Sequence, residues 1–286
     1  MTGPEKNGTT QFWMRGKIPL GVDWRGVDTP RSVTLPWYQS DSQKGYKPQG
    51  NRYGPDDIRY TFNAHGYRSM EIDPASPARK IMFVGCSFTQ GIGLPAEHIW
   101  TSRLTARVAQ QMGTPVEQHN FGMGGYGDDA FAMIVTQVLP LLKPDLLVVL
   151  STSPTRRAYH PDFDQRVPFL PHMGSHGLKA QHRAYLRLQT DAQDLYDWCR
   201  NHNLMQSVAQ LHGVPWAWQH GDAADFPVGL DPYADMSNRM PRSLRDVAQG
   251  DLARDMMHVG PDTHDAFAEM AMEFLMSGGY LDWSAR

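Results

Sequence analysis

Short apolar runs alternate with longer stretches of helical character between about residue 79 and the end of the chain. The run Lys80-Ile81-Met82-Phe83-Val84-Gly85 is apolar in its centre and stops at a glycine, which is typical of a strand buried on both faces. Further strands are expected at residues 116–121, 145–150 and 214–218. Helices are expected between and after these runs, at residues 96–112, 128–142, 179–212 and 262–276.

Strands that alternate with helices predict a parallel sheet covered by helices on both faces, which is a three-layer α/β/α domain. In sheets of this kind, ligands bind outside the carboxyl ends of the strands. We therefore expect the functional residues directly after Val84, Phe121, Leu150 and Trp218.

The first 75 residues have a different character, because Pro, Gly and Asp recur there among scattered aromatic residues such as Trp13, Trp24 and Tyr60. Aromatic rings lose much apolar burial if they stay solvated, so a disordered tail is not expected. We expect residues 1–75 to be an extension packed on a main domain of residues 76–286, either as a simple wrapping or as a wall of the binding cleft. An insertion in the main domain is expected around residues 158–250.

Composition narrows the class of protein. The chain has 286 residues, with 27 Lys and Arg against 30 Asp and Glu, and this balance argues against nucleic-acid binding as its main function. Two cysteines, Cys86 and Cys199, cannot form the framework of a disulfide-rich secreted domain. Residues 1–16 lack the apolar centre of a signal peptide, and no apolar stretch could span a bilayer, so a soluble cytoplasmic protein is expected.

A candidate nucleophile, Ser87, lies in the segment Gly85-Cys86-Ser87-Phe88-Thr89-Gln90-Gly91, directly after the first expected strand. A serine in a strand-to-helix turn presents its hydroxyl at the sheet edge, where neighbouring backbone N–H groups can stabilise an oxyanion. The alternative is that Ser87 only caps the following helix. Cys86 competes as a nucleophile, but two adjacent side chains cannot both face one acyl carbon, and we expect Cys86 to be a small buried residue.

This segment resembles the first conserved block of the SGNH (GDSL) hydrolase superfamily, with Cys86 where that block usually has Asp. The preceding Asn63-Ala64-His65-Gly66-Tyr67-Arg68 is similar to an Asn-x-x-Gly-aromatic-Arg segment found before the nucleophile in some branches. The resemblance covers about residues 60–155 and 250–276. It implies a flavodoxin-like parallel sheet, a serine nucleophile, and neither a metal nor an organic cofactor.

A glycine-rich segment, residues 120–127, follows the second expected strand. Gly122, Gly124 and Gly127 also satisfy the dinucleotide pattern G-x-G-x-x-G. That pattern needs a pyrophosphate at the start of the next helix, where Asp128 and Asp129 would repel it. The dinucleotide interpretation is therefore rejected.

The same segment resembles the second block of the superfamily. The resemblance implies that the backbone N–H of Gly125 contacts the oxyanion, and we expect Asn120 to brace the loop. The alternative is that the glycines only permit a tight turn.

The third block departs from the superfamily, which has Gly-x-Asn-Asp after the strand that ends at Leu150. Here the segment is Ser151-Thr152-Ser153-Pro154-Thr155-Arg156-Arg157, and the position of the Asn falls on Ser153. A hydroxyl can donate one hydrogen bond but reaches less far than an amide. Either Ser153 substitutes for the amide, or Arg156 helps, or catalysis is weak. Arg156 could instead bind an anionic substrate group or lie in a solvated loop.

Asp255 and His258 lie three residues apart before the last expected helix, so one turn brings their side chains to the same side. The pair resembles the final Asp-x-x-His block of the superfamily, which implies that Asp255 orients His258 and that His258 is the general base. The alternatives are a surface ion pair and a metal site that also uses His264, His160 and Asp162. No metal is expected, because the spacing contains no compact ligand motif such as H-E-x-x-H.

Taken together, these features predict a serine esterase that forms an acyl-Ser87 intermediate and needs no cofactor. By the resemblance, its substrate would be a small-molecule or carbohydrate ester with a short acyl group, such as an O-acetyl ester. Two alternatives stay open. One is an O-acyltransferase that uses the same residues, and the other is a non-catalytic binding protein, which the missing Asn favours.

Overall fold

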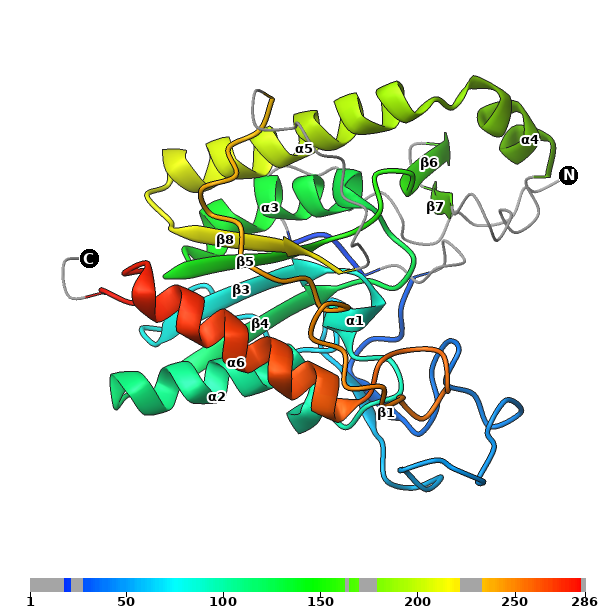
Figure 1. The fold of residues 1–286 in the computed structure, drawn as a ribbon, viewed down its shortest axis with the longest axis horizontal. Coiled ribbons are helices and arrows are strands. Elements are labelled where there is room, and N and C mark those ends of the chain that lie inside the picture. The colour runs from blue at the N-terminus through cyan, green and yellow to red at the C-terminus, as the bar shows by residue number, and fades with distance from the viewer. Residues whose placement is uncertain (1–17, 22–27, 163–164, 170–178, 222–232, 284–286) are drawn as a thin grey trace, which may run out of the picture.

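Four parallel strands, in the order β4–β3–β5–β8, form the sheet at the centre of the molecule (Figure 1). The computed structural model describes residues 18–21, 28–162, 165–169, 179–221 and 233–283. The four strands are β3 Arg79–Gly85, β4 Val116–Gly122, β5 Leu146–Ser151 and β8 Trp216–His220. All three strand pairs are parallel, so the four carboxyl ends meet at one edge. The expected parallel α/β sheet is confirmed, with β8 beginning two residues later than expected.

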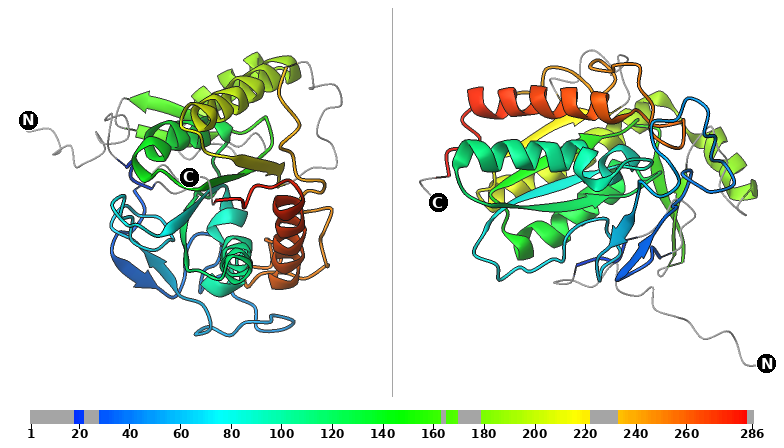
Figure 2. Two further views of the ribbon diagram at one scale, coloured as in Figure 1. Left: turned by 90° about the vertical axis from the view of Figure 1, so that its left-hand side faces the viewer. Right: turned by 90° about the horizontal axis from the view of Figure 1, so that it is seen from below.

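Helices cover both faces of this sheet and complete the three layers (Figures 1 and 2). On one face lie α2 Trp100–Met112 and α6 Pro261–Ser277, and on the other lie α3 Asp128–Leu142 and α5 Asp191–Leu211. The Trp100 ring joins α2 to the sheet and to α6, because its centroid lies 5.2 Å from that of Phe83 and 5.3 Å from that of Phe267. The sheet is thus buried on both faces, as its apolar strands require.

Two of the expected helices begin or divide differently from the sequence pattern. Residues 96–112 start with a short 3₁₀ turn, η2 Ala96–His98, and the regular helix begins only after Ile99, which is extended. Residues 179–212 form two helices, α4 Lys179–Leu188 and α5. The break has a local cause, because Thr190 caps α5 by accepting a hydrogen bond from the N–H of Gln193 at 3.1 Å.

Three shorter elements complete the described chain. Helix α1 Ser87–Gln90 follows β3 directly. Strand β1 Val33–Leu35 pairs antiparallel with β2 Tyr60–Phe62, and β6 Arg157–Asp162 forms an antiparallel hairpin with β7 Gln165–Phe169. The expected insertion at residues 158–250 therefore spans a small hairpin as well as α5 and β8, which belong to the central layers. None of the described helices combines the length and the apolar character that crossing a bilayer requires.

The described part of the amino-terminal region contacts the sheet through buried rings. The ring centroid of Tyr38 lies 4.7 Å from that of Phe62, and that of Tyr67 lies 4.8 Å from Phe121 on β4. Trp13 and Trp24 lie outside the described residues. Of the two ring contacts, the one between Tyr67 and Phe121 joins this region to the sheet, near the carboxyl end of β4, whereas Tyr38 and Phe62 both belong to the amino-terminal region.

Candidate active site

Ser87 is the first residue of α1 and lies directly beyond the end of β3. Gly85 permits the sharp turn between them, because a Cβ there would lie 2.2 Å from Thr89 Oγ1 and 3.0 Å from the carbonyl oxygen of Leu150. Cys86 occupies the helix N-cap without a side-chain capping hydrogen bond and is 0% exposed, whereas Ser87 is partly exposed. The hydroxyl of Ser87 is therefore presented at the sheet edge, and the neighbouring thiol is enclosed.

Three side chains that are distant in the sequence form a hydrogen-bonded chain at this edge. Ser87 Oγ lies 2.8 Å from His258 Nε2, and His258 Nδ1 lies 2.6 Å from Asp255 Oδ2. The ring of Phe88 contacts the imidazole edge to face, with 5.4 Å between the centroids. The structure thus brings Ser87, His258 and Asp255 together, whereas helix capping by Ser87 is not observed.

The Asp255 turn is not helical, although its two functional side chains are three residues apart. Met256 has a φ of 57°, and this turn directs the backbone N–H groups of Met257 and His258 back to Asp255 Oδ1, both at 3.0 Å. Gly260 then precedes α6, whose first residue is Pro261. The carboxylate is held by its own turn, and its second oxygen faces the imidazole.

Hydrogen bonds keep the Asp255 carboxylate ionised in spite of its burial. Burial by itself would raise the pKa of Asp255, but hydrogen bonds from His258 and Ser40 and the backbone outweigh it and lower this pKa to about 2. An ionised acceptor beside Nδ1 makes that nitrogen the donor of the ring, because a carboxylate can only accept. His258 Nε2 is then left to accept the proton of Ser87 Oγ.

The glycine-rich loop after β4 is attached to α1 by side-chain hydrogen bonds. Asn120 Nδ2 donates to the carbonyl of Thr89 at 2.6 Å, and its Oδ1 accepts from the N–H of Gly122 at 2.8 Å. The N–H of Gly124 donates to Gln90 Oε1 at 3.0 Å. Asn120 therefore braces the loop. Gly125, with a φ of 85°, lies within this braced segment.

The loop after β5 places Ser153 and Arg156 in a different setting. Ser153 Oγ lies 2.8 Å from Thr155 Oγ1 and accepts weakly from the N–H of Thr155 at 3.4 Å. In the described part of the chain, no hydrogen bond joins Ser153 to Ser87 or His258. Ser153 and Arg156 border a narrow gap together with Asp128 and Trp198, and this gap is too small to hold a water molecule. The hydroxyl at the usual Asn position is thus engaged within its own turn.

Asp128 is a buried carboxyl group below this loop. Ser151 Oγ donates to Asp128 Oδ2 at 2.5 Å, and Trp198 Nε1 donates to Ser151 Oγ at 2.9 Å. Burial raises the pKa of Asp128 to about 7, because the hydrogen bond from Ser151 offsets only part of the desolvation. The sequence placed Asp128 at the start of α3 but gave no signal that it would be enclosed.

Arg68 and Ser40 support the site from the amino-terminal region. Arg68 is fully buried and donates to the carbonyl of Gly91 and, at 2.7 Å, to that of Leu94, which fixes the chain just after α1. Ser40 Oγ donates to Asp255 Oδ2 at 2.7 Å. Arg68 belongs to the segment that resembles the superfamily, whereas nothing in the sequence singled out Ser40.

The alternative metal site would use Asp255, His258, His264, His160 and Asp162, and the structure describes the side chains of the first three. His264 is buried, and its Nδ1 accepts a hydrogen bond from the N–H of Trp100 at 3.0 Å, which satisfies the first turn of α2. The side chains of His160 and Asp162 lie outside the described residues. Within the described ranges, no group of three or more His, Cys, Asp and Glu side chains could hold a metal ion.

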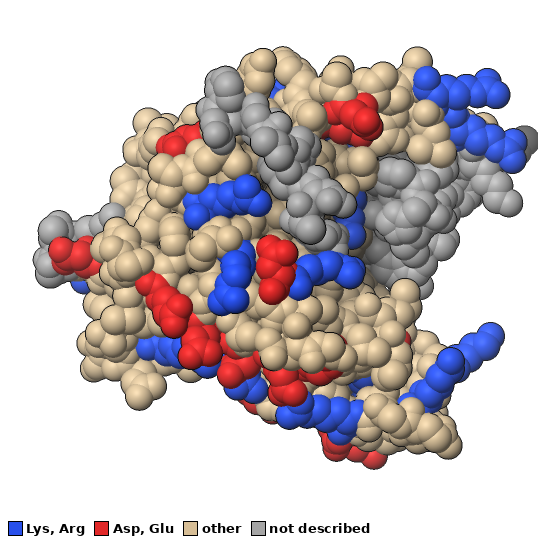
Figure 3. Space-filling view, in the orientation of Figure 1, with Lys and Arg blue, Asp and Glu red and all other residues tan. Residues whose placement is uncertain are grey.

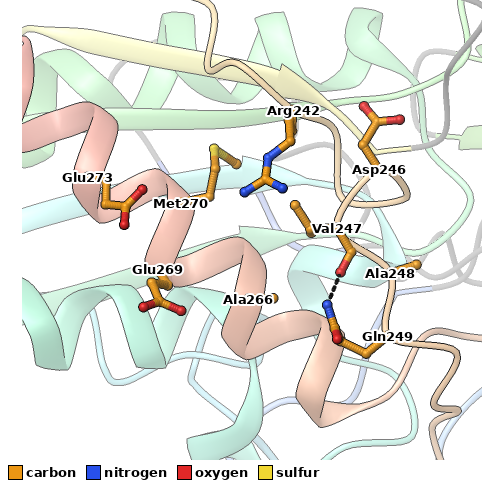
Figure 4. Close-up of a pocket in the computed structure, with 9 residues that line it drawn as sticks. All are labelled: Arg242, Asp246, Val247, Ala248, Gln249, Ala266, Glu269, Met270 and Glu273. Atoms are coloured by element: carbon orange, nitrogen blue, oxygen red, sulfur yellow. Dashed lines mark hydrogen bonds between the residues drawn. The ribbon is translucent and has the colours of Figure 1, made fainter.

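A hollow of about 370 Å³ lies between α6 and the segment that precedes it (Figure 4). Its lining includes Arg242, Asp246, Glu269 and Glu273, and none of the residues around Ser87. The hollow is therefore separate from the candidate active site.

On the face of the molecule drawn in Figure 3, positive and negative side chains are interspersed and form no extended area of one sign.

Comparisons with known proteins give likeness in structure only. No family model matches the sequence, and the search of curated proteins finds no match either. One solved structure similar to this chain is TesA, with 17% identity and a TM-score of 0.46; the match covers 70% of this chain and 99% of TesA. Another is AlinE4, an SGNH-hydrolase family esterase, with 16% identity and a TM-score of 0.40; the match covers 73% of this chain and 97% of AlinE4. A third is the Clostridium thermocellum family 3 carbohydrate esterase, with 15% identity and a TM-score of 0.42; the match covers 70% of this chain and 96% of the esterase. Because the identities and TM-scores are this low, the case for an activity rests on the geometry around Ser87.

Proposed function

We propose that this chain is a serine hydrolase of the SGNH type that cleaves carboxylic esters through an acyl-Ser87 intermediate. The observation that supports the proposal is the chain of hydrogen bonds from Ser87 Oγ through His258 to the buried Asp255, at 2.8 and 2.6 Å. A nucleophile, a base and a group that orients the base are the three parts that acyl transfer through serine requires.

In the first half of the reaction, Ser87 Oγ attacks the carbonyl carbon of the ester while His258 Nε2 takes the hydroxyl proton. The carbonyl π electrons move to its oxygen, and the resulting oxyanion returns them as the bond to the alcohol oxygen breaks. His258 gives its proton to the leaving alcohol, and Asp255 stabilises the transient imidazolium. In the second half, His258 takes a proton from water, the hydroxide attacks the acyl carbon, and Ser87 leaves with the proton.

The oxyanion would be held by the backbone N–H groups of Ser87 and Gly125. The family position of the third donor is Ser153, whose hydroxyl contacts Thr155. Loss of one preorganised donor typically lowers turnover by ~10²–10³-fold. We therefore propose an esterase of modest turnover.

A fluorophosphonate probe tests the nucleophile directly, because it phosphonylates an activated nucleophile and leaves unactivated hydroxyl groups unmodified. We expect intact-mass spectrometry to show one added probe on the unaltered protein and on Cys86→Ala, and none on Ser87→Ala. Hydrolysis of p-nitrophenyl acetate should be lost in the same variant. Absence of labelling in the unaltered protein would favour the non-catalytic binding protein, and labelling that follows Cys86 would contradict the choice of nucleophile.

The substrate class that we propose is a short-chain acyl ester, including O-acetyl groups on carbohydrates. An O-acyltransferase would use the same residues and pass the acyl group to an alcohol other than water. Product analysis with acetylated sugars, with and without a tenfold excess of an acceptor sugar, separates the two. Free acetate as the sole product in both cases supports hydrolysis, and acetylated acceptor supports transfer.

A further inference from the structure

Residues 37–41, which we name the bracket, are anchored on the residue that precedes Asp255. Arg254 is 1% exposed, and its Nε and Nη2 donate to the carboxylate of Asp41, with contacts of 2.8–3.1 Å. The same guanidinium lies over the ring of Trp37, with 3.9 Å between Arg254 Cζ and the centroid of that ring. A buried bidentate ion pair and a stacked ring together fix the bracket relative to the Asp255 turn.

Further hydrogen bonds hold the same arginine to the chain on either side of the bracket. Arg254 donates to the carbonyl of Pro36 at 2.6 Å and to that of Pro55 at 2.9 Å. Asn51 Nδ2 donates to the carbonyl of Arg254 at 2.7 Å. These side-chain contacts join residues 36–55 to Arg254 and thereby anchor the backbone directly before Asp255.

The bracket reaches the carboxylate itself through Ser40. Ser40 Oγ donates to Asp255 Oδ2 at 2.7 Å, and this oxygen is also the one that accepts from His258 Nδ1. The neighbours on both sides of this contact, Gln39 and Met256, have φ angles of 55° and 57°. A left-handed backbone is costly for such residues and persists only where the surrounding structure fixes it. The contact is therefore held by constrained backbone on both sides.

The bracket also touches the loop that carries the proposed oxyanion donor. A Cβ added to Gly124 would lie 2.4 Å from Gln39 Oε1, so the Gln39 side chain packs directly on the residue before Gly125. Two consecutive residues of the bracket thus make different contacts. Gln39 packs on the loop after β4, and Ser40 donates to the Asp255 carboxylate.

We propose that Ser40 is a positioning residue of the active site, whose hydroxyl holds the Asp255 carboxylate with Oδ2 facing His258. This inference rests on the proposed function. A carboxylate oxygen that accepts from two donors cannot rotate away from the imidazole without losing both hydrogen bonds. When His258 takes the proton of Ser87, the charge that stabilises the imidazolium is already in place.

The test compares Ser40→Ala with Ser40→Thr, which keeps a hydroxyl, and with Ser42→Ala as the matched control. Ser42 Oγ accepts from the N–H of Gly45 in an exposed turn. We expect Ser40→Ala to lower kcat for p-nitrophenyl acetate about tenfold with KM nearly unchanged, because a hydrogen bond to a charged group is lost. Ser40→Thr should recover most of the loss, and Ser42→Ala should match the unaltered protein.

A double-mutant cycle separates positioning from general packing. In an Asp255→Asn background, which already removes the charge, Ser40→Ala should cause no further fall in kcat. An equal fall in both backgrounds, or a fall in Ser40→Ala that Ser40→Thr does not recover, would overturn the proposal.

A second measurement does not depend on activity and so distinguishes failure of this inference from failure of the proposed function. Removing the Ser40 donor should raise the pKa of Asp255, because that hydrogen bond favours the charged form. The loss of stability on acidification starts near the unfolded pKa of 3.8 in both proteins, so in Ser40→Ala it should be smaller and should end at a higher pH than in the unaltered protein. If the protein is inactive but this shift occurs, only the proposed function fails. If neither kcat nor the acid unfolding profile changes, the role of Ser40 is excluded.

Discussion

The guanidinium of Arg68 donates to the carbonyl oxygen of Gly91, the residue that ends helix α1. It also donates to the carbonyls of Leu94 and Arg59, at 2.7 and 3.1 Å, and lies 4.3 Å from the centroid of the Tyr60 ring. One buried cation thereby ties the amino-terminal region to the short helix that begins at Ser87. The Asn-x-x-Gly-aromatic-Arg segment thus has a structural role at the site.

Replacing Arg68 should weaken both folding and labelling of Ser87. In Arg68→Met several buried carbonyls lose their donor, and we expect the free energy of unfolding to fall by about 3 kcal/mol or more. Arg68→Lys should recover only part of this loss, because an ammonium lacks the planar fork of donors. Urea unfolding measures the effect. Arg59→Met removes an exposed arginine paired with Asp56 and should change stability by less than ~0.5 kcal/mol.

The buried Asp128 should make stability fall as the pH rises. Its pKa is about 7 in the folded chain and near the ordinary 3.8 when unfolded, so between these values the folded state holds a proton that the unfolded state has released. The free energy of unfolding should therefore decrease from about pH 4 to pH 7. Asp128→Asn should remove this decrease, worth about 2–4 kcal/mol, while retaining an acceptor for Ser151.

Urea unfolding at pH 5 and pH 8 measures this effect. The exposed Asp56→Asn serves as the control and should keep the pH dependence of the unaltered protein. An unchanged pH dependence in Asp128→Asn would mean that the carboxyl group titrates at its ordinary pKa.

Gly122 should tolerate no side chain, because β4 and α1 meet there. A Cβ at this position would lie 2.3 Å from the backbone nitrogen of Gln90 and 2.7 Å from the carbonyl carbon of Thr89. We expect Gly122→Ala to lower stability by about 1–3 kcal/mol and to slow fluorophosphonate labelling, because the braced loop with Gly125 must move. Gly54→Ala, whose nearest contact would be 3.4 Å, should do neither.

The sheet and its main helices could be predicted from the sequence because their signals are local. Strands such as β5 Leu146–Ser151 are buried along their whole length and therefore read as apolar runs. The division of residues 179–212 could not be predicted from periodicity, because it depends on capping by Thr190. Whether a segment forms a helix or a strand depends on the pattern of several residues, whereas a break within a helical segment can depend on one side chain.

The same contrast applies to the site. Ser87, Asp255 and His258 were recognisable because each lies in a short motif beside a strand end or a helix start. Ser40 contacts its partner across 215 positions and belongs to no periodic pattern, so only the folded chain reveals it. The position of Ser153 was anticipated, but its hydrogen bond with Thr155 depends on the shape of the loop.

The anchoring of Arg254 sets the shortest chain that could act as an esterase. A fragment beginning at the first strand of the sheet would retain Ser87, His258 and Asp255, but it would lose Asp41 and the carbonyls of Pro36 and Pro55. The Arg254 guanidinium would then lose the ion pair, the Trp37 ring and the carbonyls that hold it, and the backbone directly before Asp255 would lose this anchor. Under the proposed function, the minimal catalytic unit would therefore be larger than the α/β domain that contains Ser87, His258 and Asp255.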